Sequence, residues 1–96
     1  MNKPITLFKI FRRIIGELKN ANKKYPKFSS PHEALGVIRE EYIEFELEVM
    51  KYKIGQPQSA MFGELIQLAA MSVKAMLSFW GDPEYPIHCT DETDKV

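Results

Sequence analysis

Two short acidic motifs carry the side chains best suited to chemistry. The first spans residues 40–44 with the sequence EEYIE, and the second spans residues 64–67 with the sequence ELIQ. Groups spaced three residues apart fall on the same face of a helix, so each motif would present its oxygen atoms together. Oxygen ligands suit hard divalent cations such as Mg²⁺, which often bind together with phosphates. The motifs therefore indicate a cation site between two helices, against the alternative that the carboxylates only form a solvated helix face.

The elements that must position these motifs are helices. Apolar side chains recur at helical spacing throughout, which predicts a basic amphipathic helix at about residues 5–22 and further helices at about 31–53 and about 59–80. The segment Asn20 to Ser30 has the composition of a linker, and residues 82–96 form an irregular, acidic tail. We expect one domain over residues 1–96.

The start of the second helix has a clear sequence signature. Ser30 is placed to cap it, Pro31 occupies the first helical position, and Glu33 stands where a capping box needs a carboxylate. At the end of the third helix, Gly81 occupies the position where helices commonly terminate. These signals fix where the acidic motifs lie within their helices.

In the second helix, the apolar spacing predicts a core stripe: Leu35, Ile38, Tyr42, Phe45 and Val49. Glu41, Glu44 and Glu48 fall beside this stripe, at the edge of the buried surface. Like charges on one helical face repel each other, and a cation would offset that repulsion.

The third helix is apolar on almost every side, and its few polar groups follow one line: Glu64, Gln67, Lys74 and Ser78. A charged group on such a helix is costly to bury unless it is paired or binds a metal. If the second and third helices pack antiparallel, Glu41 and Glu44 would face Glu64 and Gln67. Lys74 would then either meet a phosphate or pair with a carboxylate of the second helix.

The chain length and composition bound the fold. A chain of 96 residues with 45% hydrophobic content forms a small domain that is often marginal alone. We expect an all-α bundle of three main helices, completed by dimerisation into a four-helix-type core, as a homodimer or homotetramer.

Charge is spread unevenly although the formal net charge is zero. Residues 1–29 carry eight Lys or Arg against Glu17 alone, and residues 33–48 carry six Glu against Arg39. Such asymmetry can mark a nucleic-acid or membrane surface, can let one helix neutralise its neighbour, or can bring basic groups to a bound phosphate chain. We expect neither a nucleic-acid nor a membrane partner.

The sequence also favours a cytoplasmic location. Cys89 is the single cysteine, which is compatible with a reducing compartment. Lys9 and Arg12 interrupt the apolar run after Met1, so no signal peptide is expected. No segment is expected to be apolar over the roughly 20 residues that cross a membrane.

The two motifs resemble the signature of the MazG-like family of all-α nucleoside triphosphate pyrophosphohydrolases, which is EExxE followed by ExxD. Here they are separated by the nineteen residues 45–63. The sequences SPHEA before the first motif and LAAM after the second also resemble a MazG-like subgroup. The similarity covers about residues 29–78. It implies hydrolysis of a nucleoside triphosphate to a monophosphate and pyrophosphate, in house-cleaning or nucleotide-pool control.

The resemblance also implies roles for individual residues. Glu41, Glu44 and Glu64 would be ligands of Mg²⁺, with Mn²⁺ as a substitute. Glu40 would be the catalytic group that orients or deprotonates the attacking water. Lys74 is the candidate substrate-binding residue.

Gln67 departs from the family pattern, because the final position of the second motif is Asp in the signature. An amide oxygen can still be a metal ligand but brings no charge. The site could be weaker but active, could need one metal instead of two, or could bind without hydrolysis. The rival class is a non-catalytic helical interaction or nucleotide-binding module with a lapsed metal site. Metal dependence distinguishes the two classes.

Overall fold

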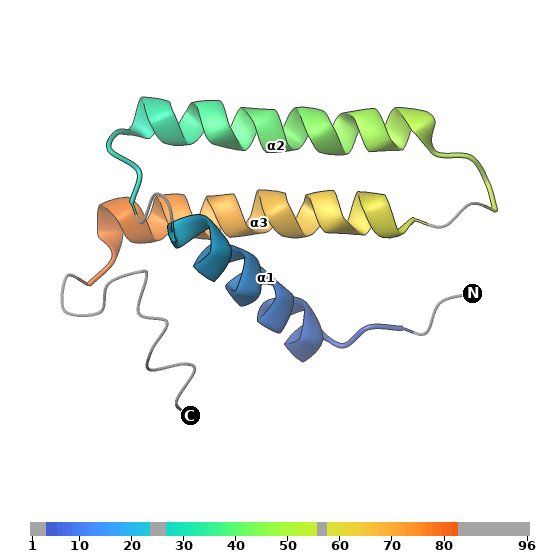
Figure 1. Ribbon diagram of the computed structural model, residues 1–96, viewed down its shortest axis with the longest axis horizontal. Coiled ribbons are helices and arrows are strands. Elements are labelled where there is room, and N and C mark those ends of the chain that lie inside the picture. Colours follow the sequence, from blue (N-terminus) through green and yellow to red (C-terminus); the bar gives the residue numbers. More distant parts are fainter. Residues whose placement is uncertain (1–3, 24–26, 56–57, 83–96) are drawn as a thin grey trace.

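Three α-helices make up the described part of the chain, which comprises residues 4–23, 27–55 and 58–82 of a computed structural model. They are α1 (Leu7–Asn22), α2 (Pro31–Lys51) and α3 (Ser59–Trp80). α2 and α3 lie side by side and antiparallel, and the C-terminal part of α1 packs against α3 (Figure 1). α3 is therefore the central helix. No strand occurs in these residues, and the predicted all-α class is confirmed.

The helix boundaries are close to those predicted. α1 begins two residues later than predicted, because Thr6 is the N-cap and its Oγ1 accepts a hydrogen bond of 3.2 Å from the Lys9 N–H. α2 ends at Lys51 because Tyr52 has an extended backbone. α3 has the predicted limits. The irregular tail was expected over residues 82–96, of which 83–96 lie outside the described residues.

The capping box of α2 forms, with one difference. The Glu33 N–H donates to Ser30 Oγ at 3.1 Å, as predicted. The Glu33 carboxylate, however, accepts from the backbone N–H and the hydroxyl of Ser29, at 2.6 and 2.9 Å. These hydrogen bonds, the backbone one foremost, lower the pKa of Glu33 because they stabilise its charged form. The Glu33 carboxylate therefore also holds Ser29, the residue before the N-cap, in place.

A cluster of buried apolar residues lies between the end of the α1–α2 linker, the start of α2 and the second half of α3, and it consists of Phe28, Ala34, Ala70 and Met71. Leu18 and Ile66 are buried as well. Phe28 belongs to the segment predicted only as a linker. Its N–H donates to Ser78 Oγ at 3.0 Å, and the Ser78 hydroxyl donates to the Lys74 carbonyl oxygen at 2.7 Å. The Ser78 hydroxyl group thus links the backbone of the α1–α2 linker to α3.

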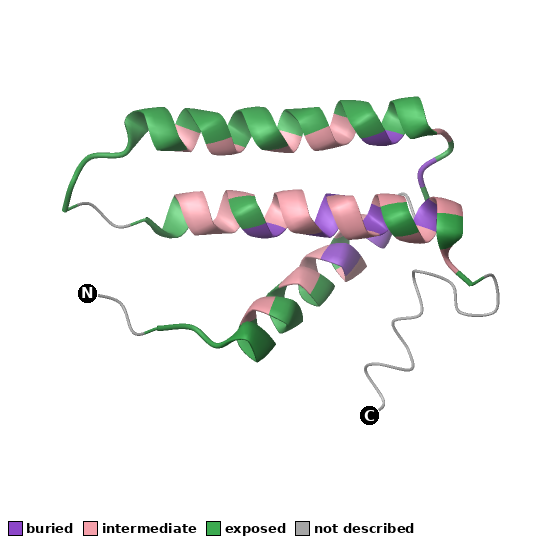
Figure 2. Cartoon of the chain, turned by 180° about the vertical axis from the view of Figure 1, so that it is seen from behind, coloured by how far each residue is buried: buried purple, intermediate pink, exposed green. Residues whose placement is uncertain are grey.

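The core stripe predicted for α2 is wrong in part. Three of its five residues are exposed: Leu35, Tyr42 and Val49. α2 carries apolar side chains on two adjacent faces, and α3 covers the face that begins at Ala34. Ala34 and Ala70 are small and buried, and small side chains let two helix backbones approach closely. The outer face of α2 remains exposed along its length (Figure 2).

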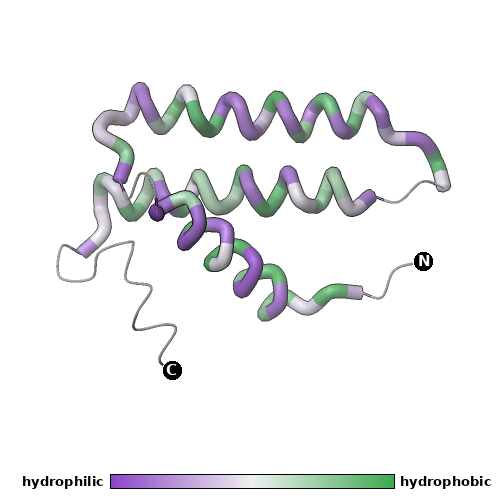
Figure 3. The backbone as a smooth tube through the Cα atoms, viewed as in Figure 1, coloured by the Kyte–Doolittle hydropathy of each residue, from purple (hydrophilic) through white to green (hydrophobic). Residues whose placement is uncertain are grey.

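The stripe of α1 is likewise buried only at one end. Leu18 is buried and Ile14 is half-buried, whereas Phe8 and Phe11 are exposed. α1 diverges from α3 toward its N-terminus, although Arg13 in its second turn still lies 5.0 Å from the centroid of the Phe62 ring of α3 (Figure 1). Apolar and polar residues alternate along α1 and α2, while α3 is apolar over most of its length (Figure 3).

α3 is long and apolar enough, by length and composition, to cross a membrane. The expectation that no segment meets this criterion is therefore wrong. Its two charged side chains, Glu64 and Lys74, lie within the packed part of the helix, toward α2 and Phe28. Helices pack on two sides of α3, but only about a fifth of its apolar stretch is buried within the described residues.

Removing the hydroxyl that fastens the linker tests this fold. Ser78→Ala leaves the buried Phe28 N–H without its acceptor, and we expect the free energy of unfolding to fall by about 1–3 kcal/mol. Ser72→Ala is the matched control, because Ser72 Oγ bonds only to Leu68 O within its own helix. Denaturant unfolding measures both. Equal effects in the two variants would contradict the tertiary role of Ser78.

Candidate functional site

Three carboxylates from two helices converge between α2 and α3. One oxygen atom from each of Glu41, Glu44 and Glu64 lies within 4.8 Å of the other two. We call these three residues the acidic cluster. The antiparallel packing predicted from sequence brings them together, and the pairing of the first motif with Glu64 is confirmed.

The cluster arises because the α3-facing row of α2 is not entirely apolar. This row starts at Ala34, continues through Ile38, and reaches Glu41 before Phe45. Those spacings of three and four residues define one face of a helix. Glu41 is consequently half-buried, and Glu44, one turn further on, reaches the same point from the solvent side.

The electrostatic environment of the cluster is unfavourable to its own charges. Burial, followed by the charges of Glu44 and Glu64, raises the pKa of Glu41 from its ordinary value of 4.5 to about 7. Burial, followed by the charge of Glu44, also raises the pKa of Glu64. The Oε1 atom of Glu41 is buried and accepts no hydrogen bond from the described residues. No positive charge among these residues counts among the causes of the raised pKa of Glu41, to which a side-chain hydrogen bond with Glu44 also contributes.

These residues fit a hard divalent cation. Carboxylate oxygens are the ligands that Mg²⁺ and Mn²⁺ prefer, and a buried acceptor without a donor lacks the partner that a cation would supply. Glu41, Glu44 and Glu64 would hold the ion. No sulfur or imidazole group is part of the cluster, so the donor set does not resemble a structural zinc site.

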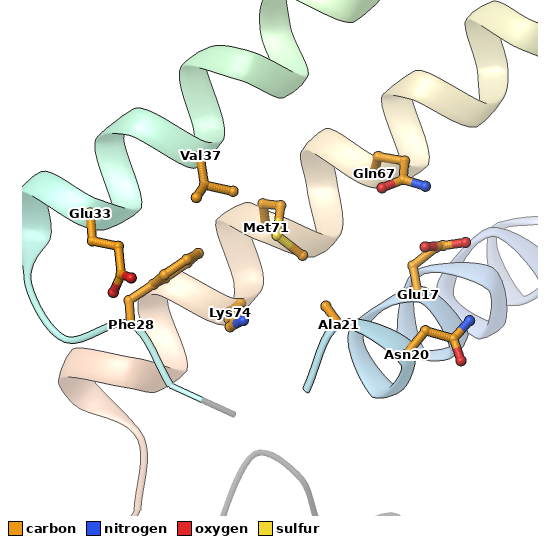
Figure 4. Close-up of a pocket in the computed structure, with 9 residues that line it drawn as sticks. All are labelled: Glu17, Asn20, Ala21, Phe28, Glu33, Val37, Gln67, Met71 and Lys74. Atoms are coloured by element: carbon orange, nitrogen blue, oxygen red, sulfur yellow. The ribbon is translucent and has the colours of Figure 1, made fainter. Parts of the chain in front are cut away.

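The remaining predicted site residues lie outside the cluster. Glu40 is exposed on α2, and its charge contributes to the raised pKa of Glu41. Gln67, one turn after Glu64, lines a neighbouring cavity, and its side chain extends toward Glu17 of α1 (Figure 4). Lys74 is about 15 Å further along the axis of α3 than Glu64, so the structure does not bring its ammonium to the acidic cluster.

Lys74 instead lies beside Phe28, an aromatic residue that sequence reasoning missed. The ammonium Nζ is 4.7 Å from the centroid of the Phe28 ring, a cation–π contact. The signal that could have identified Phe28 is its position, since it is a large apolar residue directly before the Ser29–Ser30 cap of α2. Apolar residues placed there often pack on the first turns of the helix that follows.

The raised pKa values give a pH dependence with a defined sign. The folded protein holds the proton of Glu41 more tightly than the unfolded chain, so the metal-free protein loses stability as pH rises from about 4.5 to about 7. Glu41→Gln removes the group responsible for this loss. We therefore expect the melting temperature of the variant to lie above that of the wild type at pH 8, and by a larger margin than at pH 5. Thermal unfolding in a chelating buffer measures the difference.

A divalent cation should act in the opposite direction at high pH, because it binds the ionised cluster. We expect Mg²⁺ or Mn²⁺ to stabilise the wild type more at pH 8 than at pH 5.5. At pH 8, a cation concentration of 100 times its Kd should raise the free energy of unfolding by about 2.7 kcal/mol. Glu46→Gln, an exposed position on α2, is the control and should retain the response. A response that survives in Glu41→Gln would contradict the proposed ligand set.

Comparison with known proteins adds nothing to this geometry. No protein-family model, curated protein or solved structure matches the chain.

Proposed function

We propose that this protein is a Mg²⁺-dependent nucleoside triphosphate pyrophosphohydrolase of the MazG-like kind. The observation that supports the proposal is the acidic cluster, in which three carboxylates from two helices meet around a buried oxygen that has no partner. The resemblance of the two motifs to EExxE and ExxD supports the same assignment. Its reaction would release pyrophosphate and a nucleoside monophosphate, in house-cleaning or control of nucleotide pools.

Each residue of the site would have its own role in this reaction. When bound, Mg²⁺ supplies charge neutralisation at phosphate oxygens. Glu41, Glu44 and Glu64 hold it between the helices. Glu40 lies on the same side of α2 as Glu44, about 40° away around the helix, and is exposed to water. Its carboxylate would accept a proton from the water whose oxygen forms the new bond to phosphorus, as the α–β phosphoanhydride bond breaks.

Gln67 is compatible with activity in this proposal. Its amide carries no charge, which makes the site less negative and weakens cation binding without removing any of the three carboxylates. The side chain lies on the part of α3 that lines the cavity, where a neutral donor and acceptor can contact substrate.

A second candidate is a non-catalytic helical interaction or nucleotide-binding module. The exposed apolar start of α1 favours it, since Phe8 is 68% exposed and Arg12 lies 5.8 Å from its ring centroid. A basic helix with exposed aromatic residues can dock on a partner. The absence of the motif Asp at Gln67 agrees with this candidate as well.

We further propose a homodimer that completes a four-helix-type core in the cytoplasm. The exposed apolar residues of the outer α2 face support it, and they include Leu35, Tyr42, Val49 and Met50. A small domain that leaves such a face in water gains stability when a second copy covers it. A homotetramer would extend the same arrangement.

The enzymatic proposal predicts metal-dependent pyrophosphate release. A panel of ribo-, deoxy- and modified triphosphates is incubated with Mg²⁺ or Mn²⁺, and pyrophosphate is measured. We expect Glu41→Gln to lower the rate at least about 100-fold, because loss of even an outer-shell partner of a metal ligand typically costs about 10–100-fold. Gln67→Asp should strengthen metal binding.

Glu46→Gln is the matched control for this assay, because it removes a carboxylate from α2 outside the acidic cluster. Its rate should equal that of the wild type. Activity only in Gln67→Asp would identify a lapsed site. The absence of release in every variant, with no stabilisation by metal, would favour the interaction module.

The oligomer is tested on the outer face of α2. The double substitution Leu35→Lys and Val49→Lys places two charges on this face, and we expect a shift from dimer to monomer in sedimentation velocity. Ile54→Lys is the control, because Ile54 is 94% exposed beyond the end of α2 and should leave the dimer intact. A monomeric wild type at tens of micromolar would refute the dimer.

A further inference from the structure

A cavity of about 490 Å³ lies beside the acidic cluster, between the three helices. α1 contributes Glu17 and Asn20 to its wall, and α3 contributes Gln67 and Lys74 (Figure 4). Glu33 of α2 also lines it, and the remaining lining side chains are apolar: Ala21, Phe28, Val37 and Met71. Its volume is within the range of cavities that bind small molecules, which are commonly apolar with a few polar groups.

Lys74 is the distinctive group of this cavity. Lys74 is only 3% exposed, yet its ammonium forms no hydrogen bond or ion pair with any of the described residues. Within that part of the chain its ammonium contacts the face of the Phe28 ring. Burial lowers the pKa of Lys74 even though the charge of Glu33 acts against that shift. An ammonium that lines a cavity and has no acceptor among the described residues can take one from a ligand.

The position of the cavity relative to the acidic cluster suggests which ligand. Along α3, Gln67 lies about 4.5 Å beyond Glu64, and Lys74 about 15 Å beyond it. A nucleotide is an elongated molecule with its phosphates and its base at opposite ends. Phosphates held at the acidic cluster would direct the sugar past Gln67 and the base toward Lys74.

The charge of the lining favours a base over a phosphate at Lys74. Two carboxylates, Glu17 and Glu33, line the cavity against this single ammonium, so the wall is net negative and repels a polyanion. A neutral planar ring suits the apolar side chains, and aromatic residues such as Phe28 are common stacking partners of bases.

We propose that this cavity binds the base of the nucleotide, with Lys74 donating a hydrogen bond to a ring carbonyl oxygen. An ammonium has three donors and no acceptor, so it requires an acceptor on the base. Guanine, cytosine, uracil and thymine carry a ring carbonyl oxygen. Adenine offers only ring nitrogens as acceptors, and its N1 and N7 lie beside an amino group that is itself a donor and repels an ammonium. The cavity therefore favours keto bases over adenine. This inference rests on the proposed function for the placement of the phosphates.

The test is equilibrium binding of UMP, GMP and AMP to the full chain without divalent metal, by calorimetry or by chemical-shift titration. We expect UMP and GMP to bind about tenfold more tightly than AMP, as one charge-assisted hydrogen bond implies. Lys74→Met preserves most of the buried stem, and it should remove the preference by weakening UMP and GMP alone. Lys9→Met, on the exposed face of α1, should retain the preference.

A second variant tests the cavity without touching the core. Asn20 is exposed on the rim, so Asn20→Trp should fold and should weaken all three nucleotides by obstructing entry. Equal binding of AMP in the wild type, or equal weakening of all three ligands in Lys74→Met, would overturn the inference. The latter would indicate a phosphate contact.

The outcomes for this inference and for the proposed function are separable. If UMP and GMP are preferred through Lys74 but no triphosphate is hydrolysed, the base-binding cavity stands and the pyrophosphohydrolase does not. If pyrophosphate is released with no base preference, or with a preference that Lys74→Met leaves unchanged, only the cavity inference fails.

Discussion

The central position of α3 is the constraint on which the rest of the structure depends. With α1 on one side and α2 on the other, each polar side chain along its length must find a partner inside the protein or in a ligand. Ser78 finds one in the Phe28 N–H. Among the described residues the Lys74 ammonium contacts the face of an aromatic ring, and Glu64 meets two further carboxylates. The polar side chains of α3 that find no hydrogen-bond donor or acceptor among the described residues therefore lie at the acidic cluster and in the adjoining cavity.

Stability alone does not explain the acidic cluster. Two like charges 4 Å apart repel by about 1 kcal/mol in bulk water and by about 4 kcal/mol at the effective dielectric constant of a protein surface. Neighbouring carboxylates on an exposed helix face cost only a few tenths of a kcal/mol per pair. A chain that needed only a helical bundle would be more stable with an apolar residue or Gln at Glu41, because Glu41 also has a buried oxygen with no donor. Clusters of this kind, where carboxylate pKa values are raised, are typical of binding sites for cations and of catalytic sites.

Features that depend on residues close together in the sequence could be predicted, whereas most features that depend on residues far apart in the sequence could not. The capping of α2 by Ser30 and the limits of α3 depend on neighbouring residues, and both were predictable. The convergence of Glu44 and Glu64 followed from periodicity and a single assumption of antiparallel packing. Which of two apolar faces of α2 meets α3 was not predictable, because that choice depends on the close approach at Ala34 and Ala70. The position of Phe28 before the cap of α2 indicated packing on that helix, but its contacts with Ser78 and Lys74 were hidden, since these residues are some 50 positions away in the chain.

Gln67 can be understood from the same electrostatics. In a site that already raises the pKa of Glu41 to about 7, an Asp at this position would add a fourth negative charge one turn from Glu64. The metal-free protein would then be less stable, while its affinity for a cation would be greater. An amide at this position favours the stability of the metal-free protein and lowers its affinity for a cation. It also places a group that can both donate and accept hydrogen bonds where the acidic cluster adjoins the cavity, so the residue that weakens the metal site is suited to contact the substrate.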